Sequence, residues 1–111
     1  MKENMLEVFF QGTFQHGGKI EEKSIIRMAK KRAVGNEYSY CTYEKEDEDY
    51  REGYVAVLFF EPFVERDLVL HIENNEFYEK MILFLSKLCT NKNTYINVEN
   101  YLDIIKKDLN I

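Results

Sequence analysis

Carboxylates and a tyrosine gather between residues 44 and 52, where six of nine residues are acidic and two are basic. Carboxyl pairs perform acid–base chemistry only where burial or a neighbouring charge moves a pKa, and this segment is too polar to desolvate any one of them. A cluster of carboxylates can instead imitate the phosphates of a nucleic acid and attract a basic protein surface. The residues expected to make that contact are Glu46, Asp47, Glu48, Asp49, Tyr50 and Glu52. The alternative interpretation is a solvated hairpin loop without a binding role.

Other residue types that could do chemistry are scattered. The candidate metal ligands are His16, Cys41, His71 and Cys89, with no C-x-x-C motif and no pair at i, i+4. We expect His71, on a strand, to be a partly buried histidine with one hydrogen bond. No nucleophile motif or phosphate-binding loop is present, and Gly17-Gly18 is only turn-forming. The sequence therefore predicts no enzymatic activity, no cofactor and no metal; a small hydrolase stays open only if a carboxylate or Cys41 titrates anomalously.

Basic residues concentrate between positions 19 and 35, with six bases against two acids. Together with the acidic segment, this predicts a molecule with one basic and one acidic end. The Lys30-Lys31-Arg32 cluster has no interleaved aromatic residues, so phosphate binding there would be generic. The tyrosines at 38, 40 and 43 could stack bases, but core packing explains them more simply, and no RNA-recognition motif accompanies them. A regulatory module that binds nucleic acid or self-associates through residues 19–35 is the second hypothesis, which the net charge of −5 opposes.

The composition is that of one folded domain, residues 1–111. Apolar residues make up 45% of the chain and charged residues 32%, with one Pro and five Gly. No apolar run is long enough to span a membrane, and the first residues do not have the pattern of a secretory signal. Two cysteines are ordinary for a reducing compartment. We expect a cytoplasmic protein without membrane association.

Hydrophobic periodicity predicts four helices and three strands in the order ααβββαα. The helices are expected at 4–11, ended by Gly12; at 20–33, ended by Gly35; from Asn74 or Asn75 to Leu88; and after a break at 90–94, from a cap at Asn97 with Ile96 as a hydrophobic staple. The strands are expected at 37–43, 54–60 and 67–72, with the second one central because it is apolar on both faces. The fold class is α+β, a three-stranded antiparallel meander packed by helices.

Residues 6–12 resemble the picornaviral 3C protease site used in expression vectors. Phe9 stands at a leucine position and Thr13 where proline usually follows. Met5, Leu6, Phe9 and Phe10 also form one helical stripe, so these two departures favour a native helix over a vector remnant.

Motifs in the second half of the chain follow a fixed order: an apolar strand after an acidic loop, another strand, a helix that opens on Glu-Phe-Tyr, and a short Lys-rich helix. They are Gly53-x-x-Ala56-x-x-Phe59, Asp67-Leu68-Val69-Leu70, Glu76-Phe77-Tyr78-x-x-Met81, Leu85-x-x-Leu88-Cys89 and Ile104-Ile105-Lys106-Lys107-Asp108-Leu109. From Tyr50 to the C-terminus this order resembles small bacterial immunity proteins, the partners of ribonuclease toxins from contact-dependent growth inhibition systems. The resemblance implies that the chain binds a cognate toxin nuclease domain in the cytoplasm and blocks its active site or substrate groove.

Overall fold

The computed structural model describes residues 2–62, 64–88 and 92–111. Its helices are α1 (Lys2–Thr13), α2 (Glu22–Ala29), α3 (Asn74–Leu88) and α4 (Lys92–Asp108). Its strands are β1 (Gln15–His16), β2 (Lys19–Ile20), β3 (Val34–Gly35), β4 (Ser39–Thr42), β5 (Tyr54–Phe59) and β6 (Leu68–Glu73). Helices and antiparallel sheets in this arrangement confirm the α+β class. No helix within the described ranges is long and apolar enough to cross a membrane.

The main sheet has four antiparallel strands in the order β3-β4-β5-β6. Strand β5 pairs with β4 on one side and β6 on the other, so the prediction of a central, apolar strand is confirmed. The three-stranded meander was wrong by one strand, because β3 pairs with β4 at Val34↔Cys41 and Gly35↔Tyr40. Gly35 was also expected to end a helix. It lies in β3 instead, where a Cβ atom would collide with the Ser39 carbonyl oxygen and with Tyr40.

A two-stranded hairpin of β1 and β2 precedes α2 and was not predicted. Its turn is Gly17-Gly18, and both glycines have positive φ, 60° and 79°. The turn-forming interpretation of this pair is therefore confirmed. Strands of two residues are too short to show a hydrophobic period, so the flanking strands could not be recognised from the sequence.

Several predicted helix boundaries were wrong, and Ile20, expected to begin the second helix, lies in β2 instead. Helix α1 continues through Gly12 to Thr13, and α2 ends at Ala29, so Lys30, Lys31 and Arg32 follow the helix instead of forming its last turn. Lys31 takes a positive φ of 61° directly after the helix. Such left-handed residues are common where helices end, although glycine usually supplies them.

Helix α4 begins at Lys92, ahead of both Ile96 and the expected cap at Asn97. Of the expected break at 90–94, residues 92–94 are helical, while 90 and 91 lie outside the described residues. The polar residues there are only weak helix formers, which is too small a preference to decide where a helix starts.

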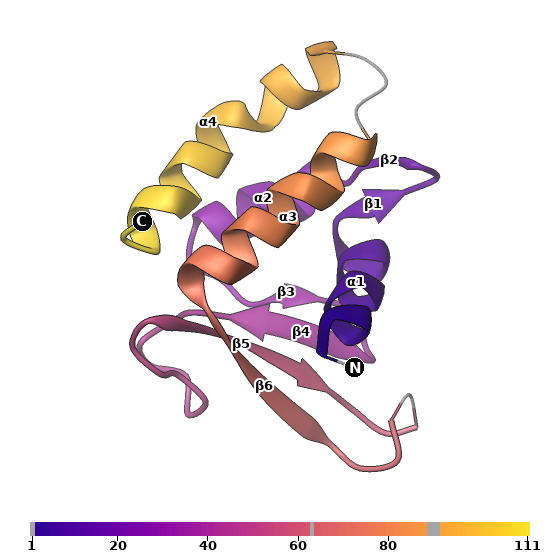
Figure 1. The fold of residues 1–111 in the computed structure, drawn as a ribbon, viewed down its shortest axis with the longest axis vertical. Helices are drawn as coiled ribbons and strands as arrows, with labels where there is room; N and C mark the ends of the chain where they lie inside the picture. The colour runs from indigo at the N-terminus through magenta and orange to yellow at the C-terminus, as the bar shows by residue number, and fades with distance from the viewer. Residues whose placement is uncertain (1, 63, 89–91) are drawn as a thin grey trace.

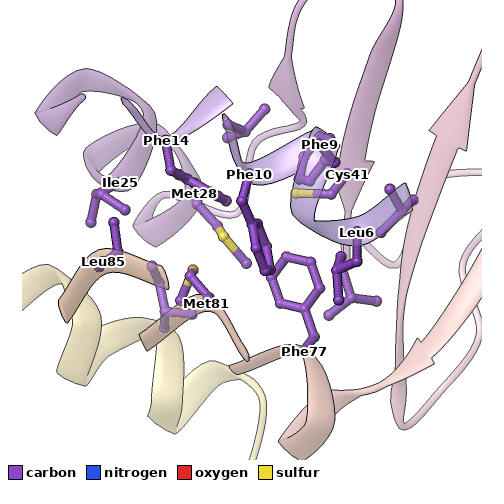
Figure 2. Close-up of a cluster of buried hydrophobic side chains, with 14 of the residues drawn as sticks. Leu6, Phe9, Phe10, Phe14, Ile25, Met28, Cys41, Phe77, Met81 and Leu85 are labelled. Atoms are coloured by element: carbon purple, nitrogen blue, oxygen red, sulfur yellow. The ribbon is translucent and has the colours of Figure 1, made fainter. Parts of the chain in front are cut away.

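The hydrophobic core lies between the sheet and the helices, which gather on one side of it (Figure 1). Figure 2 shows Phe9, Phe10 and Phe14 in this core, with Phe10 beside Phe77. The ring centroids of Phe10 and Phe77 are 5.5 Å apart, in an edge-to-face contact that aromatic rings prefer. Leu6, Phe9 and Phe10 are all buried, so the segment that resembles a protease site is part of the folded core.

Candidate functional site

Residues 44–52, the acidic loop, connect β4 to β5 without regular structure, as predicted. Backbone hydrogen bonds run from Asp47 N to Glu44 O (3.1 Å) and from Tyr50 N to Asp47 O (3.0 Å), which makes two successive turns. The Asp47 side chain accepts a further bond from Asp49 N at 2.9 Å. Aspartates often stabilise turns in this way. The loop therefore has a defined shape despite its charge.

The acidic loop is also tied to the sheet. His71 Nε2, on β6, lies 2.8 Å from the carbonyl oxygen of Asp49. Because a carbonyl oxygen can only accept, this nitrogen carries the hydrogen. Tyr54 on β5 packs edge-on against the same imidazole, with 6.5 Å between the ring centroids. His71 is thus a partly buried histidine with a hydrogen bond, which confirms the prediction.

The start and the end of the acidic loop are held as well. At its start, Glu44 Oε1 accepts a hydrogen bond from Ala33 N at 3.1 Å. At its end, Tyr54 N donates to Arg51 O at 3.1 Å, and the Arg51 guanidinium lies over the Tyr54 ring at 5.6 Å. Arg51 therefore packs on a neighbouring ring of the sheet.

The predicted contact residues differ in exposure. Glu46, Glu48 and Glu52 are exposed, whereas Asp47, Asp49 and Tyr50 are partly buried. None of the five carboxylates among them forms a salt bridge with a residue that the structure describes. Burial raises the pKa of Tyr40, and the negative charges of Asp47, Asp49 and Glu48 raise it further.

A cleft of about 570 Å³ opens beside the acidic loop. Its walls come from five parts of the chain: the residues after α2, the loop, the start of β5, the start of α3 and the end of α4. The lining residues are Lys30, Lys31, Arg32, Tyr43, Glu44, Lys45, Glu46, Tyr50, Gly53, Tyr54, Asn74, Asp108 and Leu109. A second hollow of about 500 Å³ shares Tyr50, Tyr54, Asn74 and Asp108 with the first, so the two hollows adjoin.

The cleft overturns the prediction of a basic end and a separate acidic end. Lys30, Lys31 and Arg32 line the same cleft as Glu44 and Glu46. The reason is the early end of α2, which turns the chain into β3 and brings the basic cluster beside the start of the acidic loop. The cations lie close in space to the acidic residues but far from them along the chain.

At the floor of the cleft, a buried tyrosine connects α2, β4 and the end of α4. The Tyr43 hydroxyl donates to the Met28 carbonyl oxygen at 2.6 Å and lies 3.3 Å from Asp108 Oδ2. Burial raises the pKa of this phenol, and the Asp108 charge raises it further. Tyr43 thus stays protonated and acts as a donor. Lys31 Nζ lies 4.0 Å from the other carboxylate oxygen of Asp108.

Several lining residues were not predicted as part of a site. Asn74, one of the two residues expected to cap α3, donates its side-chain nitrogen to Leu109 O at 3.0 Å, while the Asn75 side chain accepts a bond from Glu76 N at 2.9 Å. The Asn74 bond and the Tyr43–Asp108 contact join the end of α4 to the cleft, across 35 and 65 residues of sequence. No pattern in the sequence could signal contacts over such separations.

The metal-ligand candidates do not come together. His16 lies in the β1–β2 hairpin and His71 in β6, Cys41 is buried, and Cys89 is outside the described residues. Within the described part of the chain, no three histidine, cysteine, aspartate or glutamate residues are placed to hold a metal ion. Burial raises the pKa of the Cys41 thiol to about 12, so it is neutral at physiological pH.

The chain was compared with protein-family models, with curated proteins and with solved structures, and none of them matched. The resemblance to immunity proteins therefore stays a prediction from the motifs.

Proposed function

We propose that this protein is an immunity-type inhibitor that binds the basic surface of a toxin nuclease domain and blocks its active site or substrate groove. The contact residues are Glu46, Asp47, Glu48, Asp49, Tyr50 and Glu52. The observation that carries the proposal is the state of these residues: turns give the loop a defined shape, and none of the five carboxylates among the contact residues forms a salt bridge with a described residue.

A nuclease has a basic surface because it must hold phosphates, and a set of carboxylates at similar spacing can bind the same basic side chains. Charge complementarity of this kind speeds association and makes it sensitive to salt. The acidic loop is already shaped by its own turns and by the bond to His71, so binding need not order it from a flexible state. An ordered loop loses less conformational entropy when it binds. Under this proposal the inhibitor acts in the cytoplasm.

The proposal predicts that a nuclease domain is encoded beside the gene for this chain, and the direct test uses that domain. We expect tight one-to-one binding by calorimetry and loss of RNA cleavage. A triple variant, Glu46→Gln, Glu48→Gln and Glu52→Gln, removes three exposed charges without touching a bond that shapes the loop. Its affinity should fall about 100-fold at low salt, if each lost contact costs about 1 kcal/mol.

The matched control neutralises three exposed acids on the helices, through Glu79→Gln, Glu99→Gln and Asp103→Asn. This control changes the net charge by the same amount as the loop variant, so any difference in affinity between the two variants reflects where the charges lie. The control should bind like the parent protein. If the loop variant inhibited the nuclease with unchanged affinity and unchanged salt dependence, the assignment of the acidic loop would be wrong.

A separate observation supports a second candidate function, the binding of nucleic acid. A hollow of about 370 Å³ is lined by four basic residues and one apolar residue, which are Lys23, Ile26, Arg27, Lys30 and Arg32. Such a basic surface suits a nucleic-acid phosphate, as the second hypothesis requires. This function would be favoured if the protein bound unrelated RNA sequences and if that binding weakened steeply with salt. The double variant Lys23→Gln with Arg32→Gln should then abolish the binding. The acidic loop variant would leave that binding intact.

A further inference from the structure

The two faces of the main sheet differ in what covers them. Cys41, Val57 and Leu70 are paired across β4, β5 and β6. All three belong to the core or pack on it, so this row lies on the face that the helices cover. Successive residues of a strand point to opposite faces. The neighbouring paired row, Tyr40↔Leu58↔Val69, therefore lies on the face away from the helices.

Apolar and aromatic side chains cluster at one end of this outer face. The rings of Tyr40 and Phe60 stack with their centroids 5.6 Å apart. Phe60 N donates to the Tyr38 carbonyl oxygen at 2.9 Å, so these two residues also lie side by side. Tyr38 is 46% exposed and Val69 is 37% exposed, while Leu58 is only 6% exposed. We call Tyr38, Tyr40, Leu58, Phe60 and Val69 the aromatic strip.

The acidic loop lies on the same face, next to the aromatic strip. His71 is directly paired with Ala56, one row along from Leu58 on the outer face, and it holds the Asp49 carbonyl. Asp47, Glu48 and Asp49 are near enough to raise the pKa of Tyr40 beyond the effect of burial. Through His71 the acidic loop therefore adjoins the aromatic strip on the outer face, which is apolar in one part and acidic in the adjoining part.

We propose that the aromatic strip is the apolar centre of the partner-binding surface, that the acidic loop is its charged edge, and that the occupant is a basic protein surface presenting arginine. The inference rests on the proposed function and names the second half of its interface. Interfaces commonly pair an apolar centre containing tyrosine or phenylalanine with a polar rim.

Arginine fits this surface better than lysine does. Its planar guanidinium can stack on an aromatic ring of the strip while its N–H groups bond to a carboxylate of the loop. Lysine is a compact, strongly hydrated charge and cannot do both equally well.

The negative charge of the acidic loop opposes two other occupants of this sheet face, a second copy of the chain and a nucleic acid. In a two-fold dimer of this chain, the strip would have to bury itself beside two sets of loop carboxylates, since each copy brings the same surface. Like charges brought together at an interface are destabilising. The same carboxylates repel nucleic-acid phosphates from Tyr38 and Tyr40, which opposes base stacking on these rings.

The test compares a strip variant with the acidic loop variant defined above, against the nuclease domain encoded beside this gene. Tyr38→Ala with Val69→Thr removes exposed apolar surface and keeps a β-forming residue in β6. The control, Leu83→Gln with Ile104→Gln, removes exposed apolar side chains (58% and 43% exposed) from the helices. All variants should first show the circular dichroism and unfolding temperature of the parent to within a few degrees.

The strip variant should lower the affinity at least tenfold and leave its salt dependence unchanged, because an apolar contact carries no charge. The loop variant should lower both the affinity and the salt dependence. The helix control should change neither. If the loop variant fails to bind and the strip variant binds like the parent, the inference is wrong while the proposed function stands.

A second arm keeps the inference testable if the nuclease does not bind, a result that would overturn the proposed function. Blocked peptides of alternating leucine and arginine, or of leucine and lysine, are titrated into isotope-labelled protein and followed by NMR. Shift changes concentrated at Tyr38, Tyr40, Phe60 and Val69, and larger with the arginine peptide, would support the inference. Equal effects of both peptides, or changes confined to other residues, would overturn it.

Discussion

Replacement of Tyr43 by phenylalanine removes one hydroxyl from the floor of the cleft, where that group joins three parts of the fold. The hydroxyl donates to the Met28 carbonyl oxygen at 2.6 Å, near the end of α2, and lies 3.3 Å from a carboxylate oxygen of Asp108. The Met28 oxygen keeps one partner in the variant, because Lys31 N also donates to it at 2.9 Å. No buried carbonyl is left without a bond, so the loss should be moderate.

A net contribution of about 1 kcal/mol is typical of such a hydrogen bond, and bonds to charged groups contribute about 1.5–3 kcal/mol. The contact with Asp108 is long, so we expect the Tyr43→Phe variant to lose about 1–1.5 kcal/mol of unfolding free energy at pH 8. For a domain of this size, that corresponds to a fall of about 4–6 °C in the unfolding temperature.

The same hydroxyl makes this difference depend on pH. Burial and the Asp108 charge raise the pKa of Tyr43 in the folded protein above its ordinary value of 10.0, which the unfolded chain keeps. The folded state therefore retains a proton that the unfolded state releases above pH 10, and the stability that Tyr43 contributes falls as pH rises beyond that point. Between pH 8 and pH 11 the loss is about 1.4 kcal/mol, close to the whole contribution.

Urea unfolding of the parent and of Tyr43→Phe at pH 8 and pH 11 tests both effects. Differences between the two proteins cancel the titration of lysines and other groups that they share. The variant should be less stable at pH 8 and nearly equal to the parent at pH 11. Tyr50→Phe is the control, because this tyrosine is only partly buried and should cost less than about 0.5 kcal/mol. A Tyr43→Phe deficit that stayed the same at both pH values would refute the reasoning.

Three further predictions concern the fold and the loop. Phe10→Ala should destabilise the protein by about 3–5 kcal/mol in urea unfolding, since it leaves a cavity between Phe77 and Phe84; a loss below about 1 kcal/mol would contradict this packing. Gly35→Ala should lower the unfolding temperature more than Gly12→Ala does. The new Cβ at position 35 meets the Ser39 carbonyl oxygen, whereas the one at position 12 meets only a flexible side chain. His71→Ala should free the Asp49 carbonyl, so amide hydrogen exchange should speed up in residues 47–51 and not in β5.

Several features were predictable because their signals are local. The run of apolar residues in β5 is continuous, and a strand with apolar side chains on both faces is most stable in the middle of a sheet. The acidic segment had to be a loop, since six carboxylates cannot be buried together. The bounds of α3 also agree with its apolar pattern and its asparagine start.

Other features needed the folded chain. Val34 and Gly35 form a strand only because β4 offers them a pairing edge, and the end of α2 follows from the turn that leads there. The first half of the chain was accordingly the harder half to predict.

The sequence by itself determined the fold class, the central strand and the charge of the loop. Only the tertiary structure decided that the loop is bound to His71 on the outer face of the sheet, that Tyr40 and Phe60 stack on that face, and that the basic residues after α2 share its cleft. The physical reason is the range of the interactions. Periodicity and charge density act between neighbours along the chain, whereas the bonds from His71, Tyr43 and Asn74 join residues 15 to 35 positions apart.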